Sequence, residues 1–287
     1  PIDQRDPTKT TTYGVGEMVA DALKRGCQKI VMGIGGSATC DGGRGMVEAL
    51  RDKGCLDKKI YNNGHVDLTQ KGNECLAQKC KLIVACDVNN PLYGENGAAH
   101  IFAPQKGATK EQVLWLDEQL RTFAKETEQA GLATPELANH PGAGAAGGLG
   151  YALLAYLNAE LNSGIDIVLD LANFDVAIKD ADLVITGEGK SDQQTMMGKV
   201  PHGVLKRCKK AGVPVWLLSG AIDDRTGELA KNFDLVRSIN ENDNRPLSVL
   251  MQPDVAKKNI TAFLSAIFFI YLQIIRTNRN INKTNKD

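Results

Sequence analysis

The chain has 287 residues, of which 43% are hydrophobic and 24% charged, an ordinary globular composition that excludes wholesale disorder. Lys and Arg together number 34, as do Asp and Glu, so the net charge is zero and no basic excess indicates a nucleic-acid partner. The 7 cysteines include no CxxC pair, which argues against a zinc ribbon or a disulfide framework. Glycine is enriched, at 29 residues, and its clusters carry the functional signal.

In the first half of the chain, short apolar runs alternate with helical patterns. KIVMGI at 29–34 predicts a buried strand, and the pattern after it predicts a helix over 43–53. KLIVACDV at 81–88 predicts a second strand. Apolar residues at three- and four-residue spacing predict a helix over 110–130, and 151–157 is apolar enough to be a buried helix.

The second half has a regular alternation of strand and helix. We predict strands over 182–186, 214–219 and 234–239, with a helix over 200–211. Strands interleaved with single helices indicate an α/β protein with a parallel sheet covered on both faces. The apolar run at 260–275 is shorter than the ~20 residues of a membrane span, so we interpret it as a core-packed or aberrant C-terminal helix and expect no membrane partner.

The first glycine-rich cluster, GIGGSATCDGG at 33–43, leaves a predicted strand and enters a predicted helix. Glycines there let backbone N–H groups approach an anion near a helix N-terminus, and hydroxyl groups add donors. The candidate anion-binding residues are Gly35, Gly36, Ser37 and Thr39. Asp41 is a candidate Mg²⁺ ligand; the alternative is a tight turn in which Asp41 caps the helix.

The second cluster, PGAGAAGGLG at 141–150, contains a literal GxGxxG pattern. A dinucleotide-binding fingerprint needs a strand immediately before it, and GLATPELANH at 131–140 does not predict one. A Rossmann oxidoreductase is therefore disfavoured. Gly142 and Gly144 belong either to a substrate-binding loop or to close helix packing through small residues.

The third cluster, GEGKSD at 187–192, follows a predicted strand, at the sheet edge where α/β proteins bind ligands. Glu188 and Asp192 are carboxylates suited to Mg²⁺ or to accepting a proton, and Lys190 is a cation suited to a phosphoryl group. The alternative is a solvated polar loop.

A fourth candidate, Asp87, also follows a predicted strand. It is either a metal ligand or base, or part of a turn before Pro91. Lys106, in PQKG, could reach a phosphate, but we expect an exposed lysine.

Four long segments resemble the bacterial glycerate kinase family: GIGGSATCDGGRGMVEAL, VACDVNNPLYGENGAAHIFAPQKGAT, PGAGAAGGLGYALLAYLNAELNSGIDIVLD and DLVITGEGKSDQQTMMGKVPHGV. The resemblance runs over about 6–220. It implies ATP- and Mg²⁺-dependent phosphorylation of D-glycerate in the cytoplasm, with 2-phosphoglycerate as the favoured product. Nucleotide and D-glycerate are then the partners, and no nucleic acid is expected.

The resemblance also implies two α/β domains with a cleft between them, one Rossmann-like and discontinuous and the other inserted. We place the inserted domain at 1–165, the Rossmann-like part at 166–275 and a disordered tail at 276–287. Asp192 and Asp87 are the predicted catalytic residues, and Asp41, Asp87 and Glu188 the candidate metal ligands. We expect the loops at 33–43, 87–91 and 188–192 to converge on one cleft.

Two of the chain's departures from the family pattern bear on the site. Cys40 stands where the family usually has Asn. Family members begin well upstream, with motifs such as DSFKG and DGGEGT that are not in this sequence, which leads us to expect a chain that has one face of the cleft missing. The alternative function is accordingly a non-catalytic anion- or nucleotide-binding α/β fragment.

Overall fold

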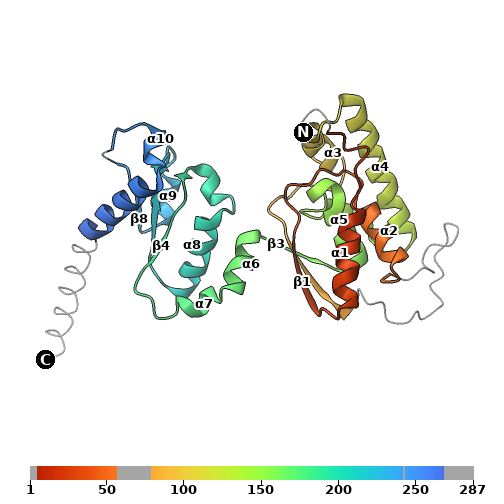
Figure 1. Ribbon diagram of the computed structural model, residues 1–287, viewed down its shortest axis with the longest axis horizontal. Helices are drawn as coiled ribbons and strands as arrows, with labels where there is room; N and C mark the ends of the chain where they lie inside the picture. Colours follow the sequence, from red (N-terminus) through yellow and green to blue (C-terminus); the bar gives the residue numbers. More distant parts are fainter. Residues whose placement is uncertain (1–4, 57–78, 242, 268–287) are drawn as a thin grey trace. The chain divides into compact units, whose positions relative to one another are not determined.

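The computed structural model describes residues 5–56, 79–241 and 243–267. The chain divides into two compact units, Pro1–Ile167 and Val168–Asp287 (Figure 1). Both contain parallel strands and helices, so the predicted α/β class is confirmed. The correspondence of each unit to a domain of the family stays a prediction.

Unit 1 is built on a three-stranded parallel sheet in the order β1-β2-β3. Its strands are β1 (Lys29–Gly33), β2 (Lys81–Ala85) and β3 (Glu160–Asn162). Leu82 and Val84 of β2 are buried, as the apolar run predicted. Gly33 pairs with Ala85, so the loops that follow β1 and β2 leave the same edge of the sheet.

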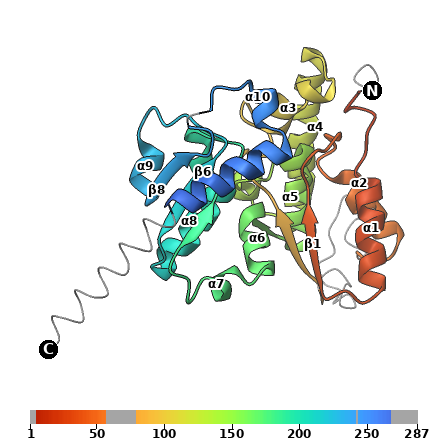
Figure 2. The same cartoon turned by 60° about the vertical axis from the view of Figure 1, so that its left-hand side comes forward.

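Helices surround this sheet. They are α1 (Tyr13–Lys24), α2 (Arg44–Asp52), α3 (Ala98–Phe102), α4 (Lys110–Gln129) and α5 (Ala145–Leu157), with 3-10 turns η4 (Pro104–Lys106) and η5 (Pro135–Asn139). α1 and α2 lie side by side in both views (Figures 1 and 2), and a Cβ on Gly16 would come within 2.4 Å of the Met46 carbonyl oxygen. The two helices pack in backbone contact because Gly16 has no side chain.

The predicted helices over 43–53 and 110–130 are confirmed to within a residue at each end. α4 begins in a capping box, in which the Thr109 hydroxyl accepts from the Gln112 N–H and the Gln112 side chain accepts from the Thr109 N–H. Its apolar face enters the core, where the Phe123 ring lies edge-on to Tyr151 with centroids 5.9 Å apart. Helix α5 starts at Ala145, before the predicted residue 151. Its first part is not regular helix, because residues 146–148 form a left-handed turn.

Unit 2 has a parallel sheet in the order β4-β6-β8 and a separate parallel pair, β5-β7. The strands are β4 (Val184–Thr186), β5 (Lys190–Ser191), β6 (Val215–Ser219), β7 (Ala221–Ile222) and β8 (Leu235–Ser238). The helices are α7 (Phe174–Ala177), η6 (Gln193–Met196), α8 (Val200–Ala211), α9 (Glu228–Asn232) and α10 (Leu247–Leu250), followed by a helix over 253–267. Helix α6 (Gly164–Leu171) contains the boundary between the units.

The strands and the helix predicted in this half are confirmed, with β4 and β8 shorter than expected. Helix α8 packs on β4 and β6 and buries Val204, Leu205 and Cys208. Most of the apolar run at 260–275 and the tail from 276 lie outside the described residues. In the described part of the chain, no helix has the length and apolar character needed to cross a bilayer.

Candidate functional site

The loop that follows β1 is open at its start. Gly35 and Gly36 are exposed, and a Cβ built on either glycine would meet no atom within 4 Å. Within the described residues, no hydrogen bond engages the backbone N–H groups of Gly35, Gly36 or Ser37. These N–H groups are the type of donor that binds a phosphate or carboxylate, so this half of the cluster suits the predicted anion-binding role.

The other half of the same loop is closely packed. A Cβ on Gly43 would lie 2.4 Å from the Ala152 Cβ, and one on Gly45 would lie 2.0 Å from the Thr11 hydroxyl oxygen. These glycines bring the start of α2 against α5 and against the turn before α1. Gly43 and Gly45 are therefore needed for close packing and do not open space for a ligand.

Asp41 ties the starts of α1 and α2 together. One carboxylate oxygen accepts from the Thr12 N–H at 2.8 Å, the Thr12 hydroxyl at 2.9 Å and the Gly45 N–H at 3.2 Å. The other oxygen accepts from the Gly43 N–H at 3.0 Å. Because both oxygens are committed to protein donors, the structure favours the tight-turn alternative for Asp41 over the metal-ligand hypothesis. Asp41 binds N–H groups at the start of α2, although the N-cap residue of this helix is Gly43.

Lys106 corrects a prediction. It is 7% exposed, not a surface lysine, and its ammonium group donates to the Ser37 hydroxyl oxygen at 2.8 Å and to the Thr39 carbonyl oxygen at 2.7 Å. Burial lowers the pKa of Lys106, against smaller opposing effects of Cys40 and Asp41. The ammonium group thus fixes the position of the open loop.

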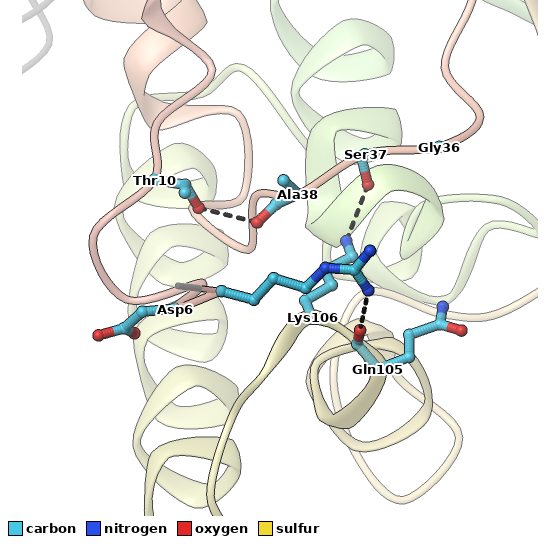
Figure 3. Close-up of a pocket in the computed structure, with 8 residues that line it drawn as sticks. Asp6, Thr10, Gly36, Ser37, Ala38, Gln105 and Lys106 are labelled. Atoms are coloured by element: carbon cyan, nitrogen blue, oxygen red, sulfur yellow. Dashed lines mark hydrogen bonds between the residues drawn. The ribbon is translucent and has the colours of Figure 1, made fainter. Parts of the chain in front are cut away.

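A cavity of about 580 Å³ lies beside this lysine (Figure 3). Its walls include Arg5, Asp6, Thr10, Gly36, Ser37 and Lys106. The Thr10 hydroxyl donates to the Ala38 carbonyl oxygen at 2.9 Å, which anchors the far side of the loop. The cavity has room for a small organic acid or a phosphate group.

The second glycine-rich cluster is buried. A Cβ on Gly142 would lie 2.8 Å from the Cys86 sulfur, and one on Gly144 would lie 2.2 Å from the Pro91 carbonyl oxygen. Both glycines are themselves buried. For Gly142 and Gly144, these contacts favour close packing over a substrate-binding loop.

Asp87 follows β2 and is exposed. One of its carboxylate oxygens accepts from the Gly164 N–H, at the start of α6, at 2.8 Å. Asp87 and the open loop leave the same edge of the sheet, because β1 and β2 are parallel and adjacent. Asp87 does not line the cavity beside Lys106.

In unit 2, Glu188 and Asp192 face the same lysine, Lys199. The Lys199 nitrogen lies 3.8 Å from Glu188 Oε2 and 3.8 Å from Asp192 Oδ1. Glu188 Oε1 accepts from the hydroxyls of Ser191 at 3.0 Å and Thr195 at 2.5 Å. Asp192 also caps η6, accepting from the Gln194 N–H at 2.9 Å. The loop is thus fixed by its own hydrogen bonds, with the two carboxylates 18% and 29% exposed.

Lys190 points to a different partner from the two carboxylates. Its nitrogen lies 3.7 Å from Asp223 Oδ2, and its side chain is 58% exposed. It lies in β5, which pairs with β7. Lys190 is therefore free to reorient toward a ligand at low energetic cost, since an exposed ion pair contributes little.

The carboxylates fit a Mg²⁺ ion that is held mainly by a nucleotide. Mg²⁺ in such sites takes one or two carboxylates and completes its coordination with water and phosphate oxygens. Glu188 and Asp192 supply such a pair, although the Asp192 side chain also accepts hydrogen bonds from the backbone N–H groups at the start of η6. Those residues contain no group of three or more His, Cys, Asp or Glu side chains that could enclose a metal, so a cage made by protein alone does not fit.

Parallel α/β units that carry polar loops at their strand ends have the architecture in which α/β proteins commonly bind ligands. The comparison with known proteins gives the family. A sequence model of the glycerate kinase family matches residues 1–271, and the chain belongs to that family.

Curated relatives agree with this assignment. A glycerate kinase of Halalkalibacterium halodurans is 47% identical over 231 residues, covering 77% of this chain and 60% of its own length. The glycerate 2-kinase of Escherichia coli K12 is 43% identical over 247 residues, covering 83% and 64%. This chain thus spans less than two thirds of the length of either relative.

A solved structure is also similar. A Salmonella typhimurium LT2 protein whose crystal structure was assigned to glycerate kinase 2 is 41% identical, with a TM-score of 0.66. The match covers 83% of this chain and 63% of that protein.

Sequence reasoning wrongly expected Lys106 to be exposed and did not identify Lys199. Neither could be inferred from charge alone, since most lysines are exposed. A usable signal for Lys106 was its neighbour: Gly107, at φ +97°, would place a Cβ 2.2 Å from the Arg5 carbonyl oxygen. Such a glycine marks a close backbone approach, which a surface turn does not require.

Proposed function

We propose that this protein transfers the γ-phosphoryl group of ATP to D-glycerate, in a Mg²⁺-dependent reaction that forms 2-phosphoglycerate in the cytoplasm. The observation that carries the proposal is the match of residues 1–271 to the glycerate kinase family, with a glycerate 2-kinase among the relatives. The open loop of unit 1 and the paired carboxylates of unit 2 supply the groups that phosphoryl transfer needs.

Phosphoryl transfer forms one phosphorus–oxygen bond, breaks another and moves one proton. The glycerate 2-hydroxyl oxygen attacks the γ-phosphorus, the bond from that phosphorus to the bridging oxygen breaks, and ADP leaves with the electron pair. The hydroxyl proton passes to a carboxylate, for which Asp192 and Asp87 are the candidates. Bound Mg²⁺ would neutralise part of the phosphate charge.

The protein's own groups then have separate tasks. The N–H groups of Gly35, Gly36 and Ser37 bind and orient an oxyanion, with Thr39 adjoining them. Glu188 would hold the metal, which leaves Asp192 as a candidate proton acceptor, and Lys190 offsets phosphate charge.

The direct test is turnover of the purified chain with ATP, Mg²⁺ and D-glycerate, followed by coupled ADP release. The product is read from the ¹H-coupled ³¹P spectrum: phosphate on the secondary oxygen of C2 couples to one proton and gives a doublet, whereas phosphate on C3 gives a triplet. A triplet would overturn the proposed regiochemistry. Nucleotide binding without turnover would favour the non-catalytic alternative, and NAD serves as the control ligand.

Asp192→Asn tests the catalytic carboxylate. Loss of the carboxylate should lower kcat by about 10²–10⁴. Stability should change little, because the amide oxygen can still cap η6. Asp234→Asn is the matched control. Asp234 also accepts a backbone hydrogen bond, from the Val215 N–H at 2.7 Å, but it lies at the start of β6, away from the strand ends that carry the candidate site. Equal turnover in the two variants would remove Asp192 from the site.

A further inference from the structure

Lys106 reaches the cavity of unit 1 because of how its turn is built. It ends η4, and Gly107 then turns the chain in a left-handed conformation. The close approach of Arg5 to Gly107 brings a second cation to the same cavity, where the Arg5 guanidinium donates to the Gln105 carbonyl oxygen at 3.2 Å. Figure 3 shows the Lys106 side chain directed at Ser37.

Lys106 has no carboxylate as a direct partner in the described part of the chain, although the charge of Asp41 partly opposes the lowering of its pKa. Within the described residues, Lys106 makes no ion pair, and its two hydrogen-bond acceptors are neutral oxygens. Cys40 does not compensate it, because burial raises the pKa of that thiol to about 11. Burying an ammonium group without a counter-charge is costly, which is a recurrent feature of functional sites.

The carboxylates near the cavity are already engaged. Asp6 accepts from the Thr8 N–H at 3.0 Å and the Thr8 hydroxyl at 2.6 Å, and it pairs with Lys9 at 3.2 Å. Asp41 is committed to the capping bonds described above. The cavity wall therefore carries surplus positive charge, from Lys106 and Arg5.

The open N–H groups lie on the same loop that Lys106 holds. The ammonium group fixes Ser37 and Thr39, while the N–H groups of Gly35, Gly36 and Ser37 make no hydrogen bond in the described part of the chain. A buried cation beside unengaged backbone donors is an arrangement that stabilises a bound oxyanion.

We propose that Lys106 is an oxyanion-binding residue, which acts with the N–H groups of Gly36 and Ser37 on a carboxylate or phosphate group entering this cavity. The inference rests on the proposed function for the identity of its two candidate ligands, the carboxylate of D-glycerate and a phosphate of ATP. It assigns to this lysine both the anchoring of the loop and direct contact with the ligand.

The test measures binding rather than turnover. Isothermal titration of the full 287-residue chain with D-glycerate, with ATP and with inorganic phosphate is compared between wild type, Lys106→Met and Lys106→Arg. We expect Lys106→Met to weaken one organic ligand, and inorganic phosphate, by about ten-fold or more, as for a lost charge-assisted hydrogen bond. The organic ligand that is weakened identifies the source of the oxyanion.

Two variants separate binding from folding. Lys110→Met removes an exposed lysine at the start of α4 and should bind as wild type does. If Lys106→Met does not fold, Lys106→Arg tests the inference instead. Arginine keeps its positive charge at alkaline pH, whereas lysine loses its proton. Phosphate binding should therefore weaken at alkaline pH in wild type and not in Lys106→Arg. Unchanged binding in Lys106→Met, or the same alkaline weakening in Lys106→Arg, would overturn the inference.

Failure of this inference and failure of the proposed function give different results. Turnover of D-glycerate with Lys106-independent binding refutes the role of Lys106 and leaves the kinase intact. Lys106-dependent phosphate binding with no turnover supports the oxyanion site and refutes the kinase activity of this chain.

Discussion

The open half of the first glycine-rich cluster of unit 1 and the whole second cluster have similar compositions and opposite surroundings. Gly35 and Gly36 of the first are exposed, with no atom within 4 Å of a built Cβ. Gly147 of the second is buried, and its Cβ would lie 2.1 Å from the Thr39 carbonyl oxygen. Glycine permits close approach to a backbone, and the approaching group can be a ligand or another part of the same chain.

The two clusters are also physically connected. The Gly42 N–H donates to the Gly147 carbonyl oxygen at 3.0 Å, so the buried cluster supports the packed half of the first loop. The buried cluster thereby holds the strand-end loop in place, and the open residues are left free to bind. A run of glycines therefore predicts that another group approaches the backbone closely. Whether that group is a ligand or another part of the chain depends on whether the glycines are exposed or buried.

The largest expected effect is on stability, at Gly147. Gly147→Ala places a side chain at φ +70° and against the Thr39 carbonyl, so left-handed strain adds to overpacking. We expect the free energy of unfolding to fall by about 3 kcal/mol or more, measured by urea denaturation. A loss below about 0.5 kcal/mol would show that the cluster is not a packing element.

Asp41→Ala is the next largest. It removes the acceptor shared by the starts of α1 and α2 and leaves the Thr12 N–H without its partner in a residue that is 2% exposed. We expect a loss of about 2 kcal/mol, from capping and desolvation together.

The control for Asp41 is chemical. Asp41→Asn keeps an acceptor oxygen and should recover part of the stability. Full stability with abolished Mg²⁺-dependent turnover in both variants would instead restore Asp41 as a metal ligand.

Much of the fold could be predicted from the apolar pattern. The strands over 29–34 and 214–219 were found as short continuous apolar runs, and the helix over 110–130 was found because apolar residues repeat at helical spacing. The prediction that the first strand is buried was wrong, because the residues of β1 alternate between exposed and half-buried. The start of α5 could not be found in this way, because the left-handed turn at 146–148 depends on contacts with the distant 39–42 loop.

The site was less predictable. The strand-end positions of Asp87, Glu188 and Asp192 followed from the order of the elements. The role of Gly142 did not, because the sequence does not record that Cys86 would lie 2.8 Å from its Cβ. Lys106 was wrongly expected to be exposed, because burial of a lysine is a property of the folded chain.

Gly35→Val sharpens the comparison from the open side. Its surroundings are empty of protein atoms within 4 Å, so we expect a stability change within about 0.5 kcal/mol, in contrast to Gly147→Ala. The added side chain should nevertheless weaken phosphate binding several-fold, by crowding the N–H donors. A destabilisation as large as that of Gly147→Ala would contradict the distinction between the clusters.

The smallest expected effect is a pH dependence at Lys106. Burial lowers the pKa of this lysine below its ordinary value of 10.5, with Cys40 and Asp41 opposing the shift and Arg5 and Asp6 lining the same cavity. A lysine with a lowered folded-state pKa binds fewer protons when folded than when unfolded. Stability should therefore rise as pH increases from the lowered pKa toward the ordinary one.

Oxyanion binding should change in the opposite direction over the same pH range. It needs the ammonium form, so phosphate affinity should fall while the stability of the ligand-free chain rises. The measurement is urea denaturation and phosphate titration of wild type and Lys106→Met in parallel, below the pKa of Cys40, about 11. Opposite slopes in wild type that vanish in the variant would assign both to Lys106. Parallel slopes would mean that the open loop binds its anion without help from the buried charge.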